Sequence, residues 1–295
     1  MDNGVESRRT GTIGALILAV VVAGSLAPTN AAPEPGDESL KGWNSLTLAA
    51  SKAVIFSAKA VIEVSEAPYA GNGKTAIAFK TRSEARILGA SGFKEETISW
   101  IDRTDHHPIE FFQMRPGESA RRFVFLDGAV RQTSWEPPPS RPDSVFADWH
   151  EMETVERKVT YSDGTAPKQG EAITDFYSLI YQLRDLDLDE QQAPREFNTL
   201  YRRHVIRLRV IPGEQRRNQR EILNETSGKT ETFKLRERRI VIKPLGPGAE
   251  SFRGMMGMQG DTEIWIDQAS GALVEIDGNA PGLGATQVLL TSFRR

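Results

Sequence analysis

The sequence contains no cysteine and only four histidines in 295 residues. Without cysteine the chain has no disulfide, no thiolate metal site and no cysteine nucleophile. A lipid-anchored exported protein, which needs a cysteine at its cleavage site, is excluded as well. The chain is nevertheless long enough to bury a core without disulfides, and 39% of its residues are hydrophobic.

The sequence also lacks the usual fingerprints of catalytic and nucleotide sites. It has no phosphate loop and no dinucleotide-binding glycine pattern. Gly89-Ala90-Ser91-Gly92 does not have the Gly-x-Ser-x-Gly spacing of a hydrolase elbow. A net charge of −3 is too small to indicate nucleic acid. We therefore predict no catalytic residue, no metal, no cofactor and no nucleic-acid partner, although paired carboxylates that meet only in space stay open.

The N-terminal segment is typical of an export signal. Arg8-Arg9 precedes an apolar run over residues 13–22, and Thr29-Asn30-Ala31 offers small residues for cleavage. The apolar run is shorter than the roughly 20 residues of a membrane-spanning helix. Gly11-Thr12 stands where a twin-arginine signal prefers bulky apolar residues, which favours the general secretory route. The sequence thus predicts a signal peptide over residues 1–31, no stable membrane span after cleavage, and a periplasmic location; an uncleaved anchor is the alternative.

The composition then divides the mature chain. Residues 32–44 have the composition of a linker, and residues 45–295 read as a single β-rich domain. Prolines 137, 138, 139 and 142 mark an excursion near residues 135–170, because proline removes donors from a sheet. Period-2 alternation predicts strands, for example at residues 206–210 and 232–243.

One segment has helical periodicity. Apolar residues recur at helical spacing from Thr174 to Leu186, and the side chain of Thr174 or Asp175 is placed to accept from the first free backbone amides. Pro194 prevents a long continuation. The sequence therefore predicts one helix over residues 174–186.

A repeated segment carries the most information about the fold. Trp100-Ile101-Asp102 recurs as Trp265-Ile266-Asp267, which is 165 positions further along (265 minus 100). The match continues without a gap through the following strand patterns. The side-chain alternation makes each copy the wall of a sheet, with Asp102 and Asp267 as turn formers. We predict a mainly β fold: a curved antiparallel sheet or half-barrel of two similar meanders with a covering helix. A β-sandwich or a lipocalin-like barrel is the alternative.

These motifs support a resemblance. Ser99-Trp100-Ile101-Asp102, Arg121-Arg122-Phe123, the predicted helix and Ile264-Trp265-Ile266-Asp267 resemble a bacterial periplasmic family of unknown function. That family is similar in fold to the lipoprotein-carrier (LolA/LolB-like) superfamily. The resemblance implies a curved sheet closed by helices, with acyl chains held in its concavity, and it brings no catalytic residues.

The candidate site residues follow from this fold. The predicted ligand pocket is lined by Trp100, Phe123, Phe125, Phe176, Leu179, Ile180, Leu183, Trp265 and Leu289. The predicted anion-binding surface consists of Arg202, Arg203, Arg207 and Arg209, unless these are simply solvated charges. Neither His106-His107 nor Met255-Met256-Gly257-Met258 predicts a metal site, because adjacent residues on extended chain diverge and methionines alone are typical of an apolar loop.

Three functions are compatible with these features. We favour an exported, non-enzymatic protein that binds or carries an amphiphilic or lipid ligand in envelope maintenance. A structural adaptor of envelope assembly, with an envelope protein as its partner, requires an interior filled by the protein's own side chains. An envelope enzyme acting on glycan or lipid requires a cleft with two carboxylates, or with a histidine and an acid.

The signal peptide gives the first testable prediction. When the full chain is produced in a bacterial host, the exported protein should begin at Ala32, as determined by its intact mass and by N-terminal sequencing. Ala31→Phe should leave the larger precursor, because the cleavage site needs a small residue. A wild-type protein that keeps residues 1–31 would contradict the assignment.

Overall fold

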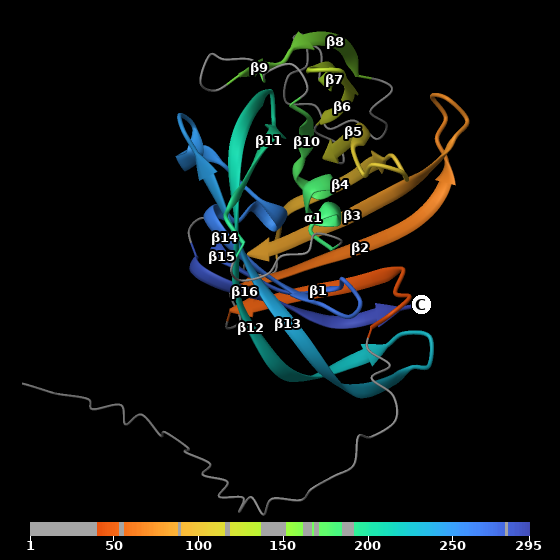
Figure 1. Cartoon of the computed structure of the whole chain (residues 1–295), viewed down its shortest axis with the longest axis vertical. Coiled ribbons are helices and arrows are strands. Elements are labelled where there is room, and N and C mark those ends of the chain that lie inside the picture. The colour runs from red at the N-terminus through yellow and green to blue at the C-terminus, as the bar shows by residue number, and fades with distance from the viewer. Residues whose placement is uncertain are drawn as a thin grey trace, which may run out of the picture. The chain divides into compact units, whose positions relative to one another are not determined.

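A single sheet of 16 β-strands makes up most of the computed structural model and curves around α1, the one α-helix of the described chain (Figure 1). The structure describes residues 40–52, 56–87, 90–115, 119–136, 152–161, 167, 171–184, 192–280 and 283–295. The first nine strands are β1 (Ser45–Lys52), β2 (Phe56–Pro68), β3 (Thr75–Ile87), β4 (Ala90–Ile101), β5 (Pro108–Arg115), β6 (Ser119–Leu126), β7 (Ala129–Glu136), β8 (Glu153–Lys158) and β9 (Thr160–Tyr161). There follow β10 (Ile173–Asp175), α1 (Phe176–Gln182), β11 (Arg195–Tyr201), β12 (His204–Asn224), β13 (Lys229–Leu245), the 3-10 turns η2 (Ala249–Ser251) and η3 (Met255–Gly257), β14 (Gln259–Asp267), β15 (Leu273–Ala280) and β16 (Gly284–Arg294).

The strand order brings the two ends of the sheet toward each other. It runs from β10 through β11–β16, then β1, and on through β2–β7 to β8, so that the last strand pairs with the first. The short strand β9 follows β8 after one residue and pairs with β12 in parallel, at His204 and Val205. The β8 end of the sheet is therefore tied to the opposite end, and the sheet curls like a barrel.

This architecture confirms the predicted mainly β fold with a curved sheet and a helix, and one continuous sheet excludes the two-sheet sandwich. The folded part includes the end of the predicted linker: Leu40 and Trp43 are buried, and the Trp43 indole donates to the Ser270 carbonyl at 3.2 Å. The predicted signal peptide and prolines 137–142 lie outside the described residues.

The repeat recurs in the strand register. Trp100 on β4 pairs with Glu110 on β5, which pairs with Val124 on β6. In the second copy, Trp265 pairs with Glu275, which pairs with Leu289. All three positions keep the offset of 165 residues, so the two meanders share one hydrogen-bonding pattern.

The two copies also share their irregularities. The register shifts directly after Trp100 in one copy and directly after Trp265 in the other. The hairpin turn of each copy is closed by a backbone hydrogen bond of its aspartate. The N–H of Asp102 donates to the His107 carbonyl at 2.8 Å, and the N–H of Asp267 donates to the Ala272 carbonyl at 2.9 Å. Their carboxylates accept from Thr104 N–H (2.7 Å) and Ser270 N–H (3.1 Å). Both aspartates therefore act as turn formers, as predicted.

Helix α1 is shorter than its sequence pattern predicts. It covers seven residues, because Asp175 ends the preceding strand and caps the helix by accepting from the N–H groups of Tyr177 and Ser178, both at 2.9 Å. Asp175 is fully buried and also accepts from the Ser99 hydroxyl on β4 at 2.8 Å. This cap fixes the start of the helix against the first meander.

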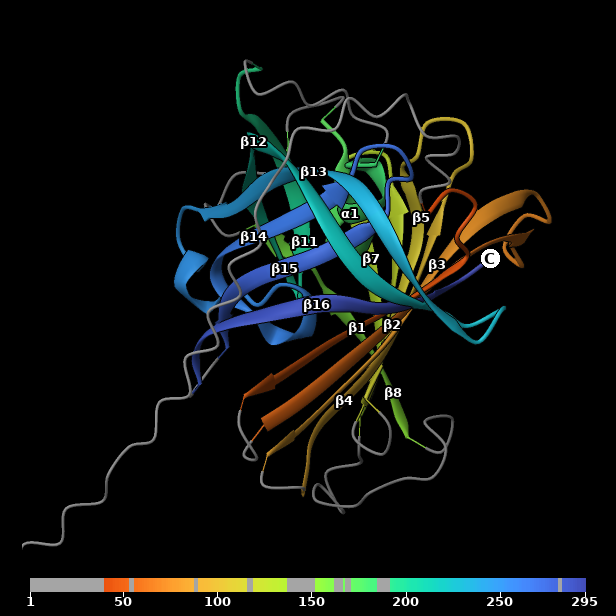
Figure 2. The ribbon, with the colours of Figure 1, turned by 90° about the horizontal axis from the view of Figure 1, so that it is seen from below.

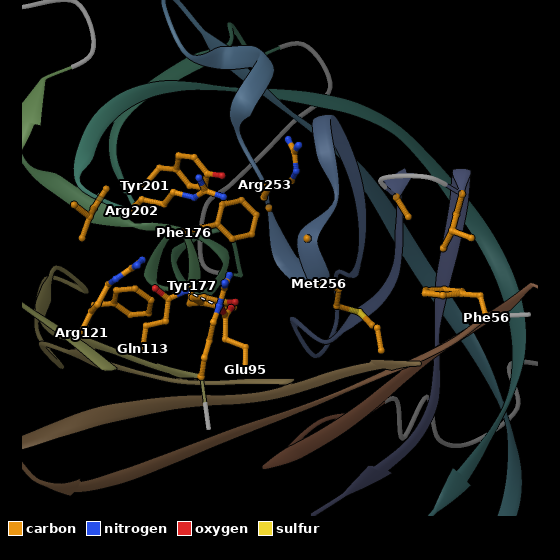
Figure 3. A pocket seen from close by; sticks show the side chains of 18 residues that line it. Phe56, Glu95, Gln113, Arg121, Phe176, Tyr177, Tyr201, Arg202, Arg253 and Met256 are labelled. Carbon is orange, nitrogen blue, oxygen red and sulfur yellow. Dashed lines mark hydrogen bonds and ion pairs between the residues drawn. The ribbon is translucent and has the colours of Figure 1, made fainter. Parts of the chain in front are cut away.

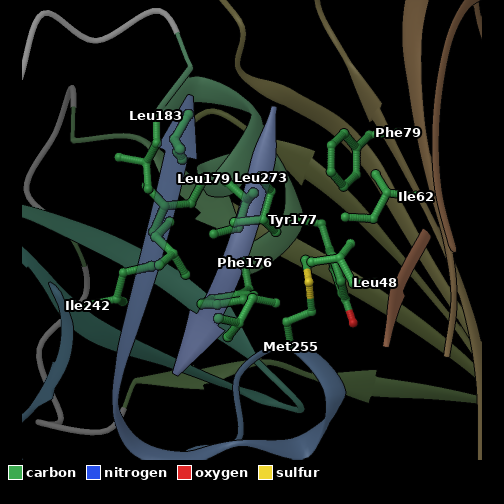
Figure 4. Packing of buried hydrophobic residues seen from close by; sticks show 14 of the residues in the cluster. Leu48, Ile62, Phe79, Phe176, Tyr177, Leu179, Leu183, Ile242, Met255 and Leu273 are labelled. Atoms are coloured by element: carbon green, nitrogen blue, oxygen red, sulfur yellow. The ribbon is translucent and has the colours of Figure 1, made fainter. Parts of the chain in front are cut away.

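The second half of α1 is packed into the core from both sides. Leu179 and Leu183 lie among side chains from the first strands and from the second meander, including Phe79 and Leu273 (Figure 4). Around Ile180 the packing leaves a gap of only about 10 Å³, which is close to the space of one water molecule. The interior is therefore filled on this side of the helix.

The long β12–β13 hairpin covers the outer face of the second meander (Figure 2). It bends where its register shifts after Pro212, and its far end pairs with β16 at Leu223 and Asn224. Phe233 packs edge-on against Phe293 at a centroid distance of 5.4 Å. A second layer of apolar contacts is thus added outside the barrel wall.

Buried ion pairs hold the same hairpin. Arg216 and Arg220 of β12 both contact Glu237 and Glu275, with 2.7 Å from Arg216 to each carboxylate, and the Arg216 guanidinium lies 3.5 Å from the Trp265 ring centroid. Burial opposes the ionisation of Glu237, but hydrogen bonds from Arg220 and Arg216 outweigh it and hold the pKa of Glu237 below its usual value. Both carboxylates are thus paired, and the pairs link β12 to β13 and β15.

Gly271 gives a stability prediction. Its φ is +65°, and a Cβ there would lie 2.9 Å from Nε of Arg184. Gly271→Ala should lower the free energy of unfolding by about 2 kcal/mol, from left-handed strain plus displacement of Arg184. Gly228→Ala, at φ +69° with open space around it, is the matched control and should cost about 1 kcal/mol. Equal losses in urea unfolding would contradict the Arg184 contact.

Asp277 gives a prediction about pH. Burial and the adjacent Glu275 raise its pKa from 3.8 to about 6. Between these values the unfolded chain is ionised at this residue while the folded protein keeps the proton, so stability falls as the pH rises through this window. Asp277→Asn should therefore leave stability unchanged at pH 3.5 and raise it by about 1 kcal/mol at pH 8, allowing for partial exposure. An equal effect at both pH values, measured by urea unfolding, would contradict this cause.

Candidate functional site

An interior cavity of about 340 Å³ lies beside the first turn of α1, between the two halves of the sheet (Figure 3). Its walls come from β2–β6, α1, β11, β15 and the segment around η3. The apolar part of the lining consists of Phe56, Ala85, Phe111, Phe176, Leu200, Met256, Ala280 and Leu283. The polar part consists of Glu95, Gln113, Arg115, Arg121, Tyr177, Tyr201, Arg202 and Arg253. The first turn of the helix thus faces open space, while its last turn faces a filled core.

The cavity has a polar end and an apolar end. In Figure 3, Arg121, Arg202 and Gln113 lie at one end, and Phe56 lies at the other. Strand alternation explains the wall of the first meander, because Phe111 and Gln113 are two residues apart on β5 and share a face. Such a gradient suits a molecule with one polar and one apolar end.

One carboxylate at the polar end is already neutralised. Glu95 accepts from the Gln113 amide at 2.7 Å and from Nε of Arg115 at 3.3 Å. Arg121 is not neutralised in this way. Burial lowers the pKa of its guanidinium, and the nearby Arg115 and Arg202 lower that pKa further. The polar end therefore carries an excess of positive charge.

Tyr177 forms part of the cavity floor as a neutral group. Its ring packs on Phe111 at a centroid distance of 5.8 Å, and burial raises the pKa of its hydroxyl. That hydroxyl is bonded to Thr81 and Thr97, whose own hydroxyls are 2.7 Å apart. The polar atoms of this floor are thus satisfied internally.

Two residues of the lining have a strained backbone. Arg202 and Met256 have φ values of +56° and +57°, and the third non-glycine residue with positive φ in the described chain is His106. Such conformations cost energy and are often retained at functional sites. Their presence here supports the cavity as the candidate site.

The structure places the predicted pocket residues in four groups. Phe176 lines the cavity. Phe123 stacks behind Phe111 at 5.8 Å, and Phe125 packs against the same core. Leu179, Ile180 and Leu183 belong to the filled side of the helix.

The fourth group corrects the prediction. Trp100, Trp265 and Leu289 lie on the opposite face of the sheet, because Trp100 pairs with Glu110 while the next residue, Phe111, faces the cavity. Trp100 packs instead against Tyr69, with ring centroids 5.5 Å apart, and Leu289 borders a separate hollow formed by β1, β2 and β16. The predicted pocket had combined residues from both faces of the sheet.

The predicted arginine surface is also divided. Arg202 and Arg203 are both exposed in the turn between β11 and β12, and of the two only Arg202 lines the cavity. Arg207 is exposed on β12, and Arg209 is paired with Glu196 at 2.6 Å. These four residues do not form one surface.

The sequence pattern missed Arg121 and Arg253 in the cavity lining. Arg121 is two residues before Phe123 and four before Phe125 on an alternating strand, so the pattern places a charge on the same face as apolar residues. That conflict is a signal for a polar end of the cavity. Arg253 lies in irregular chain between η2 and η3, and no periodicity indicates its position.

The methionines and histidines do not come together in one site. Met255 and Met258 are buried in the core and Met256 lines the cavity, while the His106 ring packs on Tyr181 at 5.4 Å. Within the described ranges, no group of three or more acidic or histidine residues is arranged to hold a metal ion.

No family model matches the chain, and no curated protein matches it. Among solved structures, the chain is similar to a β-barrel-like protein of the domain of unknown function DUF1849 from Brucella abortus. That match has a TM-score of 0.49 and 10% identity, and it covers 84% of this chain and 94% of the other. No helix in the described part of the chain is long and apolar enough to cross a membrane.

Proposed function

We propose that this protein is exported to the periplasm and binds an amphiphilic or lipid ligand in the interior cavity, as a non-enzymatic carrier or binding protein of the cell envelope. The observation that carries the proposal is the open volume of about 340 Å³ beside α1, with aromatic and aliphatic walls and a polar end. Ligand sites in proteins have this size class and this mixture of apolar walls with a few polar groups.

The driving force for binding is the removal of apolar surface from water. Each Å² of apolar ligand surface that enters the cavity contributes roughly 25 cal/mol. Phe56, Phe111 and Phe176 present flat apolar surfaces from three separate elements. A cavity walled in this way favours an alkyl or acyl chain over a fully polar molecule.

The open side of the helix favours the carrier over the structural adaptor. An adaptor needs an interior filled by its own side chains, and this holds only on the Leu179–Leu183 side. Phe176 and Tyr177 face open volume instead. The sequence motifs resemble a periplasmic family of unknown function that is similar in fold to the lipoprotein-carrier (LolA/LolB-like) superfamily. Those carriers hold acyl chains in the concavity of the sheet, which supports the proposal of a carrier.

The proposal that the protein is not an enzyme rests on the acidic residue in the cavity lining. Among the described residues of the lining, Glu95 is the carboxylate, and Gln113 and Arg115 both hold it. A glycosidase-type reaction needs two carboxylates that flank the bond to be cleaved. The export part rests on the signal-like sequence of residues 1–31.

A cavity-filling variant tests the proposal. Wild-type protein should take up a dansyl-labelled undecanoic acid saturably, with a blue-shifted emission. Ala85→Trp places a large ring in the cavity and should weaken this uptake by about tenfold or more, because it removes the volume that the chain occupies. Arg82→Trp adds the same bulk at an exposed position of the same strand and should bind like wild type.

Circular dichroism would confirm that both variants keep the fold. No saturable uptake by the wild-type protein would contradict the proposal. Equal uptake by folded Ala85→Trp would place the ligand elsewhere.

A further inference from the structure

Three arginines from separate parts of the chain line the cavity. Arg121 comes from β6, Arg202 from the turn between β11 and β12, and Arg253 from the segment between η2 and η3. In Figure 3, Arg121 and Arg202 lie at the end of the cavity that is remote from Phe56, and Arg253 lies between that end and Phe56. We refer to Arg121, Arg202 and Arg253 as the arginine cluster.

None of the three has a carboxylate partner among the described residues. Arg253 donates only to the backbone carbonyls of Phe252 at 3.0 Å and Glu250 at 3.4 Å. Arg202 lies over the Tyr201 ring at 5.3 Å. Arg121 is half-buried and makes no hydrogen bond or ion pair within the described chain.

Several other arginines of the same sheet are paired with carboxylates. Arg122, next to Arg121 but facing outward, is 2.6 Å from Glu110, and Arg209 is 2.6 Å from Glu196. At the cavity, the Glu95 carboxylate is already paired with Arg115 at 3.3 Å, so it is not a partner for the cluster. Glu136, the other acid near Arg121, is held by Arg157.

Like charges in a partly desolvated site repel one another and favour a counterion. Burial of Arg121 and the proximity of Arg115 and Arg202 lower the pKa of Arg121, which expresses that repulsion. A guanidinium presents a planar fork that matches a carboxylate or a phosphate with two parallel hydrogen bonds. An anionic group at this end of the cavity would therefore satisfy the cluster.

We infer that the ligand of the cavity carries a carboxylate or phosphate group on an apolar body, with the anionic group at the arginine cluster and the apolar body directed toward Phe56 and Met256. This inference rests on the proposed function, because it assigns the chemistry of the molecule that the cavity holds. Arg121 is the principal contact, since it is half-buried and its side chain has no partner in the described chain.

Isothermal titration calorimetry of the mature protein at pH 7.5 tests the inference with four probes of one chain length. These are decanoate, decyl phosphate, decanol and decyltrimethylammonium. One or both anions should bind about tenfold or more tightly than decanol, and the cation more weakly than decanol. The ratio of the two anion affinities shows which anionic group the cluster prefers.

The outcomes separate the two proposals. Equal binding of decanol and both anions would overturn the anionic assignment while leaving the amphiphile site intact. Failure of all four probes to bind would overturn the proposed function and this inference together.

Variants locate the anion. Arg121→Gln and Arg253→Gln should each weaken decanoate binding by about tenfold and leave decanol within about twofold of wild type. The control Arg209→Gln removes a charge outside the cavity and should change neither affinity. Decanoate binding that is the same in Arg121→Gln as in Arg209→Gln would overturn the assignment.

Stability gives a second readout for the same residue. Without ligand, Arg121→Gln should raise the melting temperature, because it removes an uncompensated charge, whereas decanoate should stabilise the wild-type protein more than the variant. A lower melting temperature for ligand-free Arg121→Gln would mean that the arginine is structural and would contradict its role as an anion contact.

Discussion

A mismatch in size governs this structure: a curved sheet of 16 strands encloses more space than a helix of seven residues fills. The Asp175 cap fixes where the helix begins, and Leu179, Ile180 and Leu183 close the core on one side. On the other side the first turn faces open volume. The cavity is therefore a direct consequence of the short helix.

The repeated meanders make the wall, and their outer faces are sealed differently. In each copy a tryptophan lies across from a buried glutamate, at Trp100–Glu110 and Trp265–Glu275. Tyr69 and Arg122 satisfy the first glutamate, whereas Arg216 and Arg220 of the long hairpin satisfy the second. The inner faces are left to the core and the cavity, so the same motif supports the wall without entering the site.

Local patterns in the sequence predict much of this fold. The offset of 165 residues, the turn-forming aspartates and the alternation of the strands all have counterparts in the register. The pocket was predicted less well, because Trp100 and Trp265 were combined with residues of the opposite face. The placement of Arg121, Arg202 and Arg253 along one cavity depends on how far the sheet curls, and long-range curvature leaves no local signal. The charge of Arg121 on an apolar face was the clue that the pattern did offer.

The central claim is that the open side of the helix holds a natural amphiphile. The most direct measurement is mass spectrometry of the organic extract of the protein, purified without detergent from cells that produce it. We predict that the extract contains one class of molecule with a carboxylate or phosphate on an apolar body, stoichiometric with the chain and reduced in Ala85→Trp. The claim would be contradicted if the extract of the folded protein contained no amphiphile and the same protein also failed to bind added amphiphiles.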